Sequence, residues 1–161
     1  MLTHPRKPVC LSLMSFDMPL WSVTETSAAV YQKDTEQFHI LLTEPSLHHH
    51  TPSRSSTTVA ATQRSPRLIW LEVSPYRVIM TMQGDGDSSY RHFWEEGVYG
   101  LSRYWLQNFE PHHGRQFRLR NFTRRLEFTQ DTLPKSLRIE YELWANRLHL
   151  GRYVLSLDVH L

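Results

Sequence analysis

The sequence contains few of the residues and motifs that identify common protein classes. Cys10 is the only cysteine among the 161 residues, which excludes an intrachain disulfide and a structural zinc site built from several thiolates. Glycine occurs 6 times, and the phosphate-binding motifs GxGxxG and GxxxxGK[ST] are absent. The catalytic motifs HExxH and GxSxG are absent as well. The sequence therefore has no signature of a common nucleotide-binding enzyme, metalloprotease or α/β-hydrolase.

Long apolar runs are also missing. No apolar run approaches the ~18–20 residues that a membrane-spanning helix requires. A short apolar stretch at 9–14 follows Arg6 and Lys7, but Asp17 and Pro19 interrupt it and no small-residue cleavage site follows. We therefore expect no membrane span, no secretory signal and a cytoplasmic location.

The chain has no large excess of either charge. The 18 Lys+Arg and 16 Asp+Glu give a formal net charge of +2, which neither requires nor excludes a nucleic-acid partner. Hydrophobic residues make up 40% of the sequence and aromatic residues 12%, as in folded globular proteins. This composition is sufficient for one sizeable core.

Composition divides the chain into three segments. Residues 1–43 form an N-terminal segment, in which 28–43 is patterned as a β-hairpin. Residues 44–66 are rich in Ser, Thr, Pro and His and have few large apolar residues, which predicts a flexible linker or loop. The main body begins at residue 67 and extends to residue 161.

The main body is predicted to be an α+β domain. Two β-rich runs, 68–73 and 76–82, are joined by a turn at Ser74-Pro75. Large residues at helical spacing then predict one long helix over 88–109, and Pro111 ends it. Alternating apolar residues after the helix predict further antiparallel strands. The expected fold is an antiparallel sheet of about five to seven strands with the helix packed on one face.

The first functional hypothesis is a non-catalytic protein-binding factor, of an assembly, adaptor or regulatory kind. Trp144 falls on the polar face of its predicted strand, and exposed tryptophan beside arginine is typical of interface hot spots. The residues predicted to bind a protein partner are Trp144, Arg118, Arg120 and Arg138. The absence of catalytic signatures favours binding over enzymatic activity.

The second hypothesis is an RNA- or single-strand-binding sheet. Basic residues exceed acidic ones between 111 and 161, and arginines on a strand face can follow phosphates while aromatic rings stack on bases. The candidate residues are Arg115, Arg118, Arg120, Phe122, Arg124 and Arg125. The structural alternative is that these arginines pair across strands with Glu127, Glu140 and Glu142.

A third hypothesis is a small-ligand protein or enzyme with a pocket between helix and sheet, lined by Trp94 and Tyr104. The histidine clusters His48-His49-His50 and His112-His113 have no carboxylate at a recognised metal-ligand spacing. We therefore predict no metal and no cofactor, and the oligomeric state stays open.

Overall fold

The computed structural model describes residues 2–44, 67–84, 88–106 and 115–160. These residues form ten β-strands and no helix. The strands are β1 (Leu2–Ser15), β2 (Trp21–Gln32), β3 (Phe38–Glu44), β4 (Arg67–Val73), β5 (Arg77–Gln83), β6 (Ser88–Glu95), β7 (Tyr99–Leu106), β8 (Arg115–Gln130), β9 (Pro134–Ala145) and β10 (Leu148–Val159).

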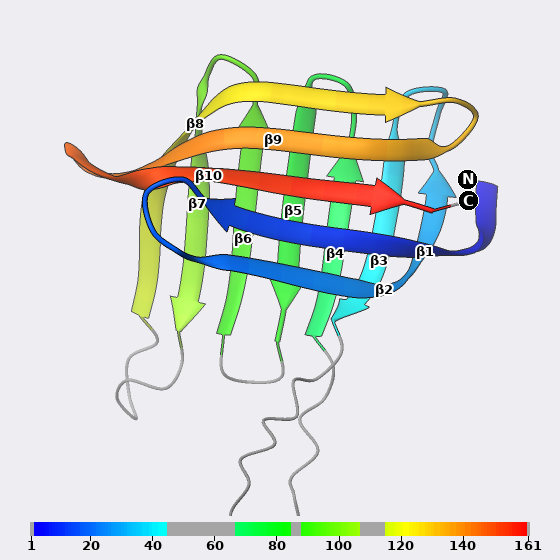
Figure 1. The fold of residues 1–161 in the computed structure, drawn as a ribbon, viewed down its shortest axis with the longest axis horizontal. Coiled ribbons are helices and arrows are strands. Elements are labelled where there is room, and N and C mark those ends of the chain that lie inside the picture. Colours follow the sequence, from blue (N-terminus) through cyan, green and yellow to red (C-terminus); the bar gives the residue numbers. More distant parts are fainter. Residues whose placement is uncertain (1, 45–66, 85–87, 107–114, 161) are drawn as a thin grey trace, which may run out of the picture.

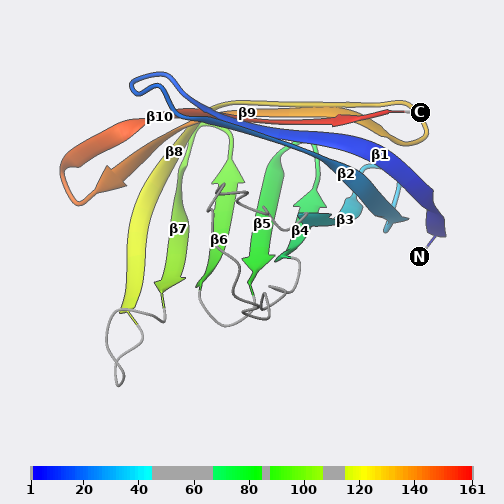
Figure 2. The same cartoon turned by 60° about the horizontal axis from the view of Figure 1, so that its bottom comes forward.

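The ten strands close into a single antiparallel barrel. Each strand pairs with its neighbours in the sequence, and β1 pairs with β10 to complete the ring. Strands β9, β10 and β1 run across β3 to β7, and β8 and β2 bend from one direction to the other, so that the two halves of the barrel cross at a steep angle (Figure 1). The same crossing is visible from the turned view (Figure 2). Closure gives every strand a neighbour on both sides.

Alternation along the strands builds the core. In β4, the interior positions Ile69, Leu71 and Val73 are buried and the residues between them are more exposed. Successive side chains of a strand point to opposite faces, and residues directly opposite each other on neighbouring strands share a face. The barrel interior is therefore apolar over most of its length, with buried residues that include Val9, Ile40, Val78, Leu137, Ile139 and Leu157.

The prediction of a long helix over 88–109 is wrong. Residues 88–106 form the antiparallel hairpin of β6 and β7, and 107–109 lie outside the described residues. Gly97 lies in the turn of this hairpin with a φ of 77°, a conformation that no residue of a right-handed helix adopts. Because the turn interrupts the alternation between the two strands, the large residues of β6 and β7 together fall at a spacing that resembles that of a helix. The aromatic residues of this segment favour strands.

The α+β fold class is wrong for the same reason. The described residues contain strands and no helix, and the sheet has ten strands instead of five to seven. The antiparallel pairing predicted for the sheet is confirmed for all neighbouring strands. Strands β1 to β3 from the N-terminal segment and β4 to β10 from the main body belong to the same barrel. Residues 45–66, most of the predicted linker, lie outside the described residues.

Candidate functional site on the outer face of strands β6 to β8

Four arginines lie together on the outer face of three neighbouring strands. Arg91 of β6 is opposite Arg103 of β7, and Arg103 is opposite Arg118 of β8. Arg120, two residues further along β8, lies on the same face opposite Leu101. All four arginines are exposed. We call Arg91, Arg103, Arg118 and Arg120 the arginine face.

No carboxylate neutralises the arginine face within the described ranges. Arg118 donates a hydrogen bond to Gln116 Oε1 at 3.4 Å, and Arg120 donates one to the backbone oxygen of Asn146 at 3.3 Å. Neither Arg91 nor Arg103 forms an ion pair with any described residue. Strand β7 has no acidic residue, and like charges directly opposite each other destabilise a sheet. This face therefore carries a concentrated positive charge.

The other arginines of β8 and β9 behave differently. Arg124 pairs with Glu142 at 2.6 Å, Arg125 pairs with Glu127, and Arg138 pairs with Glu140 at 3.3 Å. The cross-strand pairing weighed as the structural alternative thus holds for Arg124, whereas Arg125 and Arg138 pair with glutamates on their own strands. It does not hold for Arg118 and Arg120, which have no acidic partner among the described residues.

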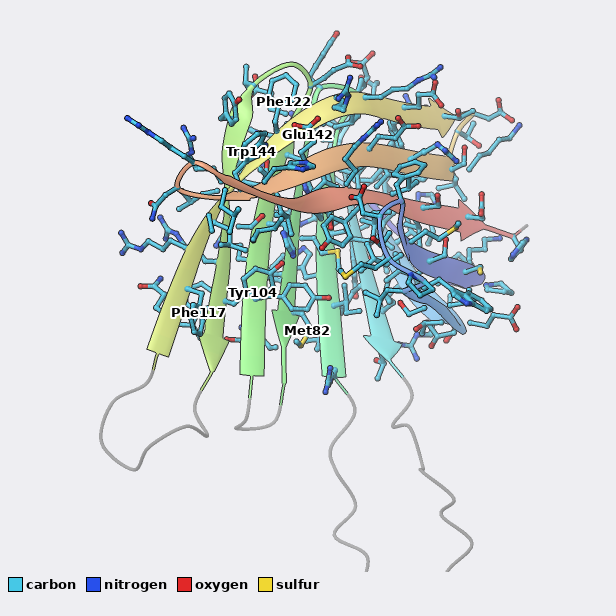
Figure 3. The ribbon with its side chains drawn as sticks, turned by 60° about the vertical axis from the view of Figure 1, so that its left-hand side comes forward. Met82, Tyr104, Phe117, Phe122, Glu142 and Trp144 are labelled. Carbon is cyan, nitrogen blue, oxygen red and sulfur yellow. The ribbon has the colours of Figure 1, made fainter. Side chains whose placement is uncertain are left out.

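Glu142 links the paired arginine to a tryptophan. Its carboxylate accepts hydrogen bonds from Arg124 and, at 3.2 Å, from Trp144 Nε1. Burial opposes ionisation, but these hydrogen bonds and the charge of Arg124 outweigh it, so the pKa of Glu142 is lowered. The Trp144 ring lies 4.8 Å from that of His149, and its side chain is half-buried. Glu142, Trp144 and Phe122 lie toward one end of the barrel (Figure 3).

Aromatic rings accompany the arginine face. A hollow of about 550 Å³ opens on the outer face of β6 to β8. The Arg120 guanidinium lies 5.0 Å from the centre of the Tyr99 ring, and that ring lies 5.0 Å from Phe122. Tyr99 is 56% exposed. The hollow is lined by Arg91, Phe93, Tyr99, Gly100, Leu101, Arg103 and Arg120.

The predicted site residues are therefore divided between several locations. Arg118 and Arg120 lie on the arginine face, and Phe122 lies beside it, on the same outer side of β8. Arg138 of β9 is opposite Glu127 of β8, in a different part of the outer surface. Arg115 begins β8, and its side chain lies outside the described part of the structure.

Sequence reasoning missed Arg91 and Arg103. The predicted helix placed both residues on an isolated element, whereas the strand pairing brings them beside Arg118. A signal was present in the alternation of Tyr90, His92 and Trp94 with Arg91 and Phe93. That alternation would have placed Arg91 on an outer face.

The described residues contain neither a cluster of metal ligands nor a membrane-spanning helix. Within the described ranges, no group of three or more His, Cys, Asp or Glu side chains could hold a metal ion. Both histidine clusters, 48–50 and 112–113, lie outside these ranges. The described residues include no helix with the length and apolar character needed to cross a membrane.

Comparison with known proteins gives a fold and no family. No protein-family model and no curated protein matches the chain. The crystal structure of the ywiB protein from Bacillus subtilis is similar, with a TM-score of 0.57 and 13% sequence identity over 99% of this chain and 96% of that one. A conserved protein of unknown function with a hot dog fold from Alicyclobacillus acidocaldarius matches with a TM-score of 0.21 and 10% identity, over 96% of this chain and 79% of that one. The first similarity supports the barrel fold alone, and the second carries no structural conclusion.

Proposed function

We propose that the protein binds single-stranded nucleic acid on the arginine face. The observation that carries this proposal is the row of Arg91, Arg103 and Arg118 on adjacent strands, without an acidic partner in the described structure. Adjacent strands are ~4.8 Å apart, so positive charge repeats at short intervals across the sheet. The phosphates of a nucleic acid bound across the strands would relieve the repulsion between these arginines. Binding would also release the counterions condensed on the nucleic acid.

The aromatic residues favour a single strand over a duplex. Tyr99 is exposed beside Arg120, and Phe93 lines the same hollow. Unpaired bases can stack on such rings, whereas the bases of a duplex are already stacked on one another. The combination of arginines and aromatic rings on one sheet face is the arrangement that sequence-tolerant single-strand binding requires.

The test is the salt dependence of oligonucleotide binding. Fluorescence anisotropy of a labelled oligothymidylate should show binding that weakens steeply between 50 and 300 mM salt, with a log–log slope of roughly −3 for four arginine contacts. The double variant Arg91→Gln/Arg103→Gln removes two of these contacts. We expect weaker binding and a slope that is smaller in magnitude by roughly 1.4.

The matched control is Arg125→Gln/Arg138→Gln. It changes the net charge by the same amount, but both of its arginines are already paired with glutamates. We expect it to retain the wild-type slope. An equal loss of oligonucleotide affinity in the two double variants would show that only net charge matters, and it would contradict a site on β6 to β8. Absence of oligonucleotide binding at 50 mM salt would also contradict the proposal.

A second candidate function, binding of a protein partner, is favoured by the hairpin of β1 and β2. Ser15 Oγ accepts hydrogen bonds from the backbone amides of Asp17 and Met18, and Asp17 Oδ2 accepts one from the Arg152 amide at 2.7 Å. The turn is thus fixed through its polar groups, and its apolar side chains face solvent. The exposed apolar residues of this hairpin tip are Met14, Phe16, Met18, Leu20, Trp21 and Val23. Clusters of this kind mark interaction surfaces.

Site-specific photocrosslinking in cells tests this candidate. A photoreactive phenylalanine analogue at position 21, on the hairpin tip, should give a discrete adduct with a protein. The same analogue at position 76, an equally exposed position in the turn between β4 and β5, should not. Identical adduct patterns at the two positions would contradict a docking role for the hairpin.

A further inference from the structure

Strand β2 extends beyond its pairing with β3. It pairs with β1 along most of its length, whereas its pairing with β3 ends at Ala28, which lies opposite Leu42. Strand β3 continues beside β4 as far as Glu44, which lies opposite Arg67. Because β2 bends between the two halves of the barrel (Figure 1), one side of residues 21–27 has no neighbouring strand among the described residues. We call this side of residues 21–27 the free edge.

The hydrogen-bond pattern of the β1–β2 hairpin shows which backbone groups lie on the free edge. The Ser15 amide donates to the Leu20 carbonyl oxygen at 2.9 Å, so these two residues form a hydrogen-bonded pair. In an antiparallel ladder, such pairs alternate with pairs that are not hydrogen-bonded. Every second residue of β2 therefore directs its N–H and C=O away from β1. On the free edge these residues are Trp21, Val23, Glu25 and Ser27.

The free edge is open to solvent. Trp21 is 71% exposed and Val23 is 48% exposed, whereas Ala28, the residue at which β3 joins, is buried. Thr26 Oγ1 donates to the Thr43 carbonyl oxygen at 2.8 Å, so a side chain links the two strands at the point where they separate. An exposed strand edge with unpaired N–H and C=O groups is a template for the addition of another strand.

Two other strand ends that extend beyond a neighbour carry features that block strand addition. Residues 2–7 of β1 lie beyond the end of β10 and include Pro5 and Lys7. Residues 115–119 of β8 lie beyond its pairing with β9 and include Arg118. Proline and charged side chains are common means of protecting an edge. The free edge contains no proline and no basic residue, and its valine and threonines favour strand structure.

An acidic row meets the free edge at Glu25. Glu25 is opposite Cys10 of β1, and Cys10 is opposite Asp158 of β10. Both carboxylates are exposed, and neither forms an ion pair with a described residue. A strand that adds to the free edge is therefore favoured when it places a basic residue opposite Glu25. The free edge of a second copy cannot supply this residue, because it contains none.

We infer that the free edge binds an extended segment of a partner protein, which adds to β2 as a further strand. This inference rests on the second candidate function, the binding of a protein partner at the hairpin of β1 and β2. Backbone hydrogen bonds to Val23 and Glu25 supply the affinity. The bound segment has apolar residues opposite Trp21 and Val23, a basic residue opposite Glu25, and polar residues between them, on the side of Thr24.

A heptapeptide of this pattern tests the inference. The peptide acetyl-Thr-Thr-Lys-Thr-Val-Thr-Val-amide, paired antiparallel with residues 21–27, places its lysine opposite Glu25 and its valines opposite Val23 and Trp21. In NMR spectra of the isotope-labelled protein, we expect saturable shifts of the backbone amides of Val23 and Glu25. These amides should also gain protection from hydrogen exchange. The Thr24 amide should shift less, because it is already bonded to β1.

N-methylated peptides provide the matched control. A methyl group on the amide of the fifth peptide residue points at Val23 and removes one donor, so it should weaken binding roughly tenfold. A methyl group on the amide of the fourth residue points away from the free edge and should leave the affinity unchanged. Glu25→Lys should weaken binding of the original peptide, and exchange of the peptide lysine for glutamate should restore it. Equal losses for the two methylated peptides would overturn the inference, because side chains alone would then hold the peptide.

A proline on the free edge separates this inference from the second candidate function. Val23→Pro removes an N–H that points away from β1, so the β1–β2 ladder is retained, and Val23→Thr keeps that N–H. With the photoreactive residue at position 21, the protein adduct should be lost in Val23→Pro and retained in Val23→Thr. An adduct that persists in Val23→Pro would overturn strand addition and leave protein binding by the hairpin intact. Absence of an adduct in the otherwise wild-type chain would contradict both.

Two occupants from the chain itself are distinguished by further measurements. If the Val23 and Glu25 amides of the free protein are already protected from hydrogen exchange, a segment of the same chain covers the free edge. If sedimentation velocity shows a dimer that Val23→Pro dissociates, a second copy covers it. Either result would overturn the binding of a partner's segment.

Discussion

His92 couples the interior of the barrel to pH. Its ring stacks on Trp94 at 4.8 Å, and both of its nitrogens have hydrogen-bond partners. Burial lowers the pKa of His92 from 6.5 to about 3, so between these values the unfolded chain binds a proton that the folded chain does not. The stability contributed by this neutral histidine is complete above pH 6.5 and is lost progressively as the pH falls toward 3. From pH 7.5 to 5.0 the loss is about 2 kcal/mol.

We therefore predict that His92→Gln flattens the pH dependence of stability. Urea denaturation measures the free energy of unfolding at pH 7.5 and at pH 5.0. Between these two pH values, this free energy should fall by about 2 kcal/mol more in the wild-type protein than in the variant. The variant is less stable at pH 7.5 because it disturbs the hydrogen bonds to Ser102 and Tyr104. His160→Gln, at an exposed histidine, should keep the wild-type difference. An unchanged pH dependence in His92→Gln would contradict a neutral, buried imidazole.

At the scale of elements, two glycines determine that residues 88–106 form a hairpin. Gly97 has a φ of 77° in the turn, with no atom within 4 Å of the position that a Cβ would occupy. Gly100 has the opposite constraint, because a Cβ there would overlap the backbone oxygen of Phe93 and press on Asn121 Oδ1. The first glycine is needed for its backbone conformation and the second for close approach of two strands.

These roles predict different outcomes for alanine substitutions. Gly97→Ala should lower the free energy of unfolding by about 1 kcal/mol, and Gly97→Asn by less, because asparagine adopts positive φ more readily. Gly100→Ala should be more harmful than Gly97→Ala, because the β6–β7 pairing must shift to accommodate the methyl group. Urea denaturation measures all three values. Equal losses for Gly97→Ala and Gly97→Asn would show that the backbone conformation of the turn is unimportant.

The same elements show how far the sequence predicts this fold. The turn at Ser74-Pro75 follows from a local signal, and the structure confirms it. The segment 88–109 was misread because its aromatic spacing fits a helix when the strand-breaking turn at Gly97 is ignored. Local periodicity cannot reveal which strands become neighbours, since pairing is decided by contacts between distant residues.

The candidate site illustrates the same limit. Arg118 and Arg120 were predicted on one strand face because they are two residues apart. Their association with Arg91 and Arg103 depends on the register of β6, β7 and β8, which no single segment encodes. The acidic partners that separate Arg124 and Arg125 from the arginine face also depend on geometry across and along the strands.

At the scale of the whole molecule, the barrel depends on pairing between the first and last strands. Leu11 of β1 is opposite Leu157 of β10, and both side chains are buried in the core. Strand β10 also pairs with β9, so it closes the gap between the two ends of the sheet. Removal of β10 would expose the edges of β1 and β9, and exposed edges promote association between chains. The core would also lose an entire row of apolar side chains.

A fragment ending at residue 147 tests this dependence. We expect the fragment to associate in solution, because its two edges are unpaired, and to recover as a monomeric complex when a peptide of residues 148–160 is added. The peptide with Leu155→Asp should fail to bind the fragment, because position 155 faces the core. The peptide with Ser156→Asp should bind it, because position 156 faces outward. Sedimentation velocity and titration of far-UV circular dichroism measure recovery. A monomeric fragment with the cooperative unfolding of the full chain would contradict the argument, because closure through β10 would then contribute little to the fold.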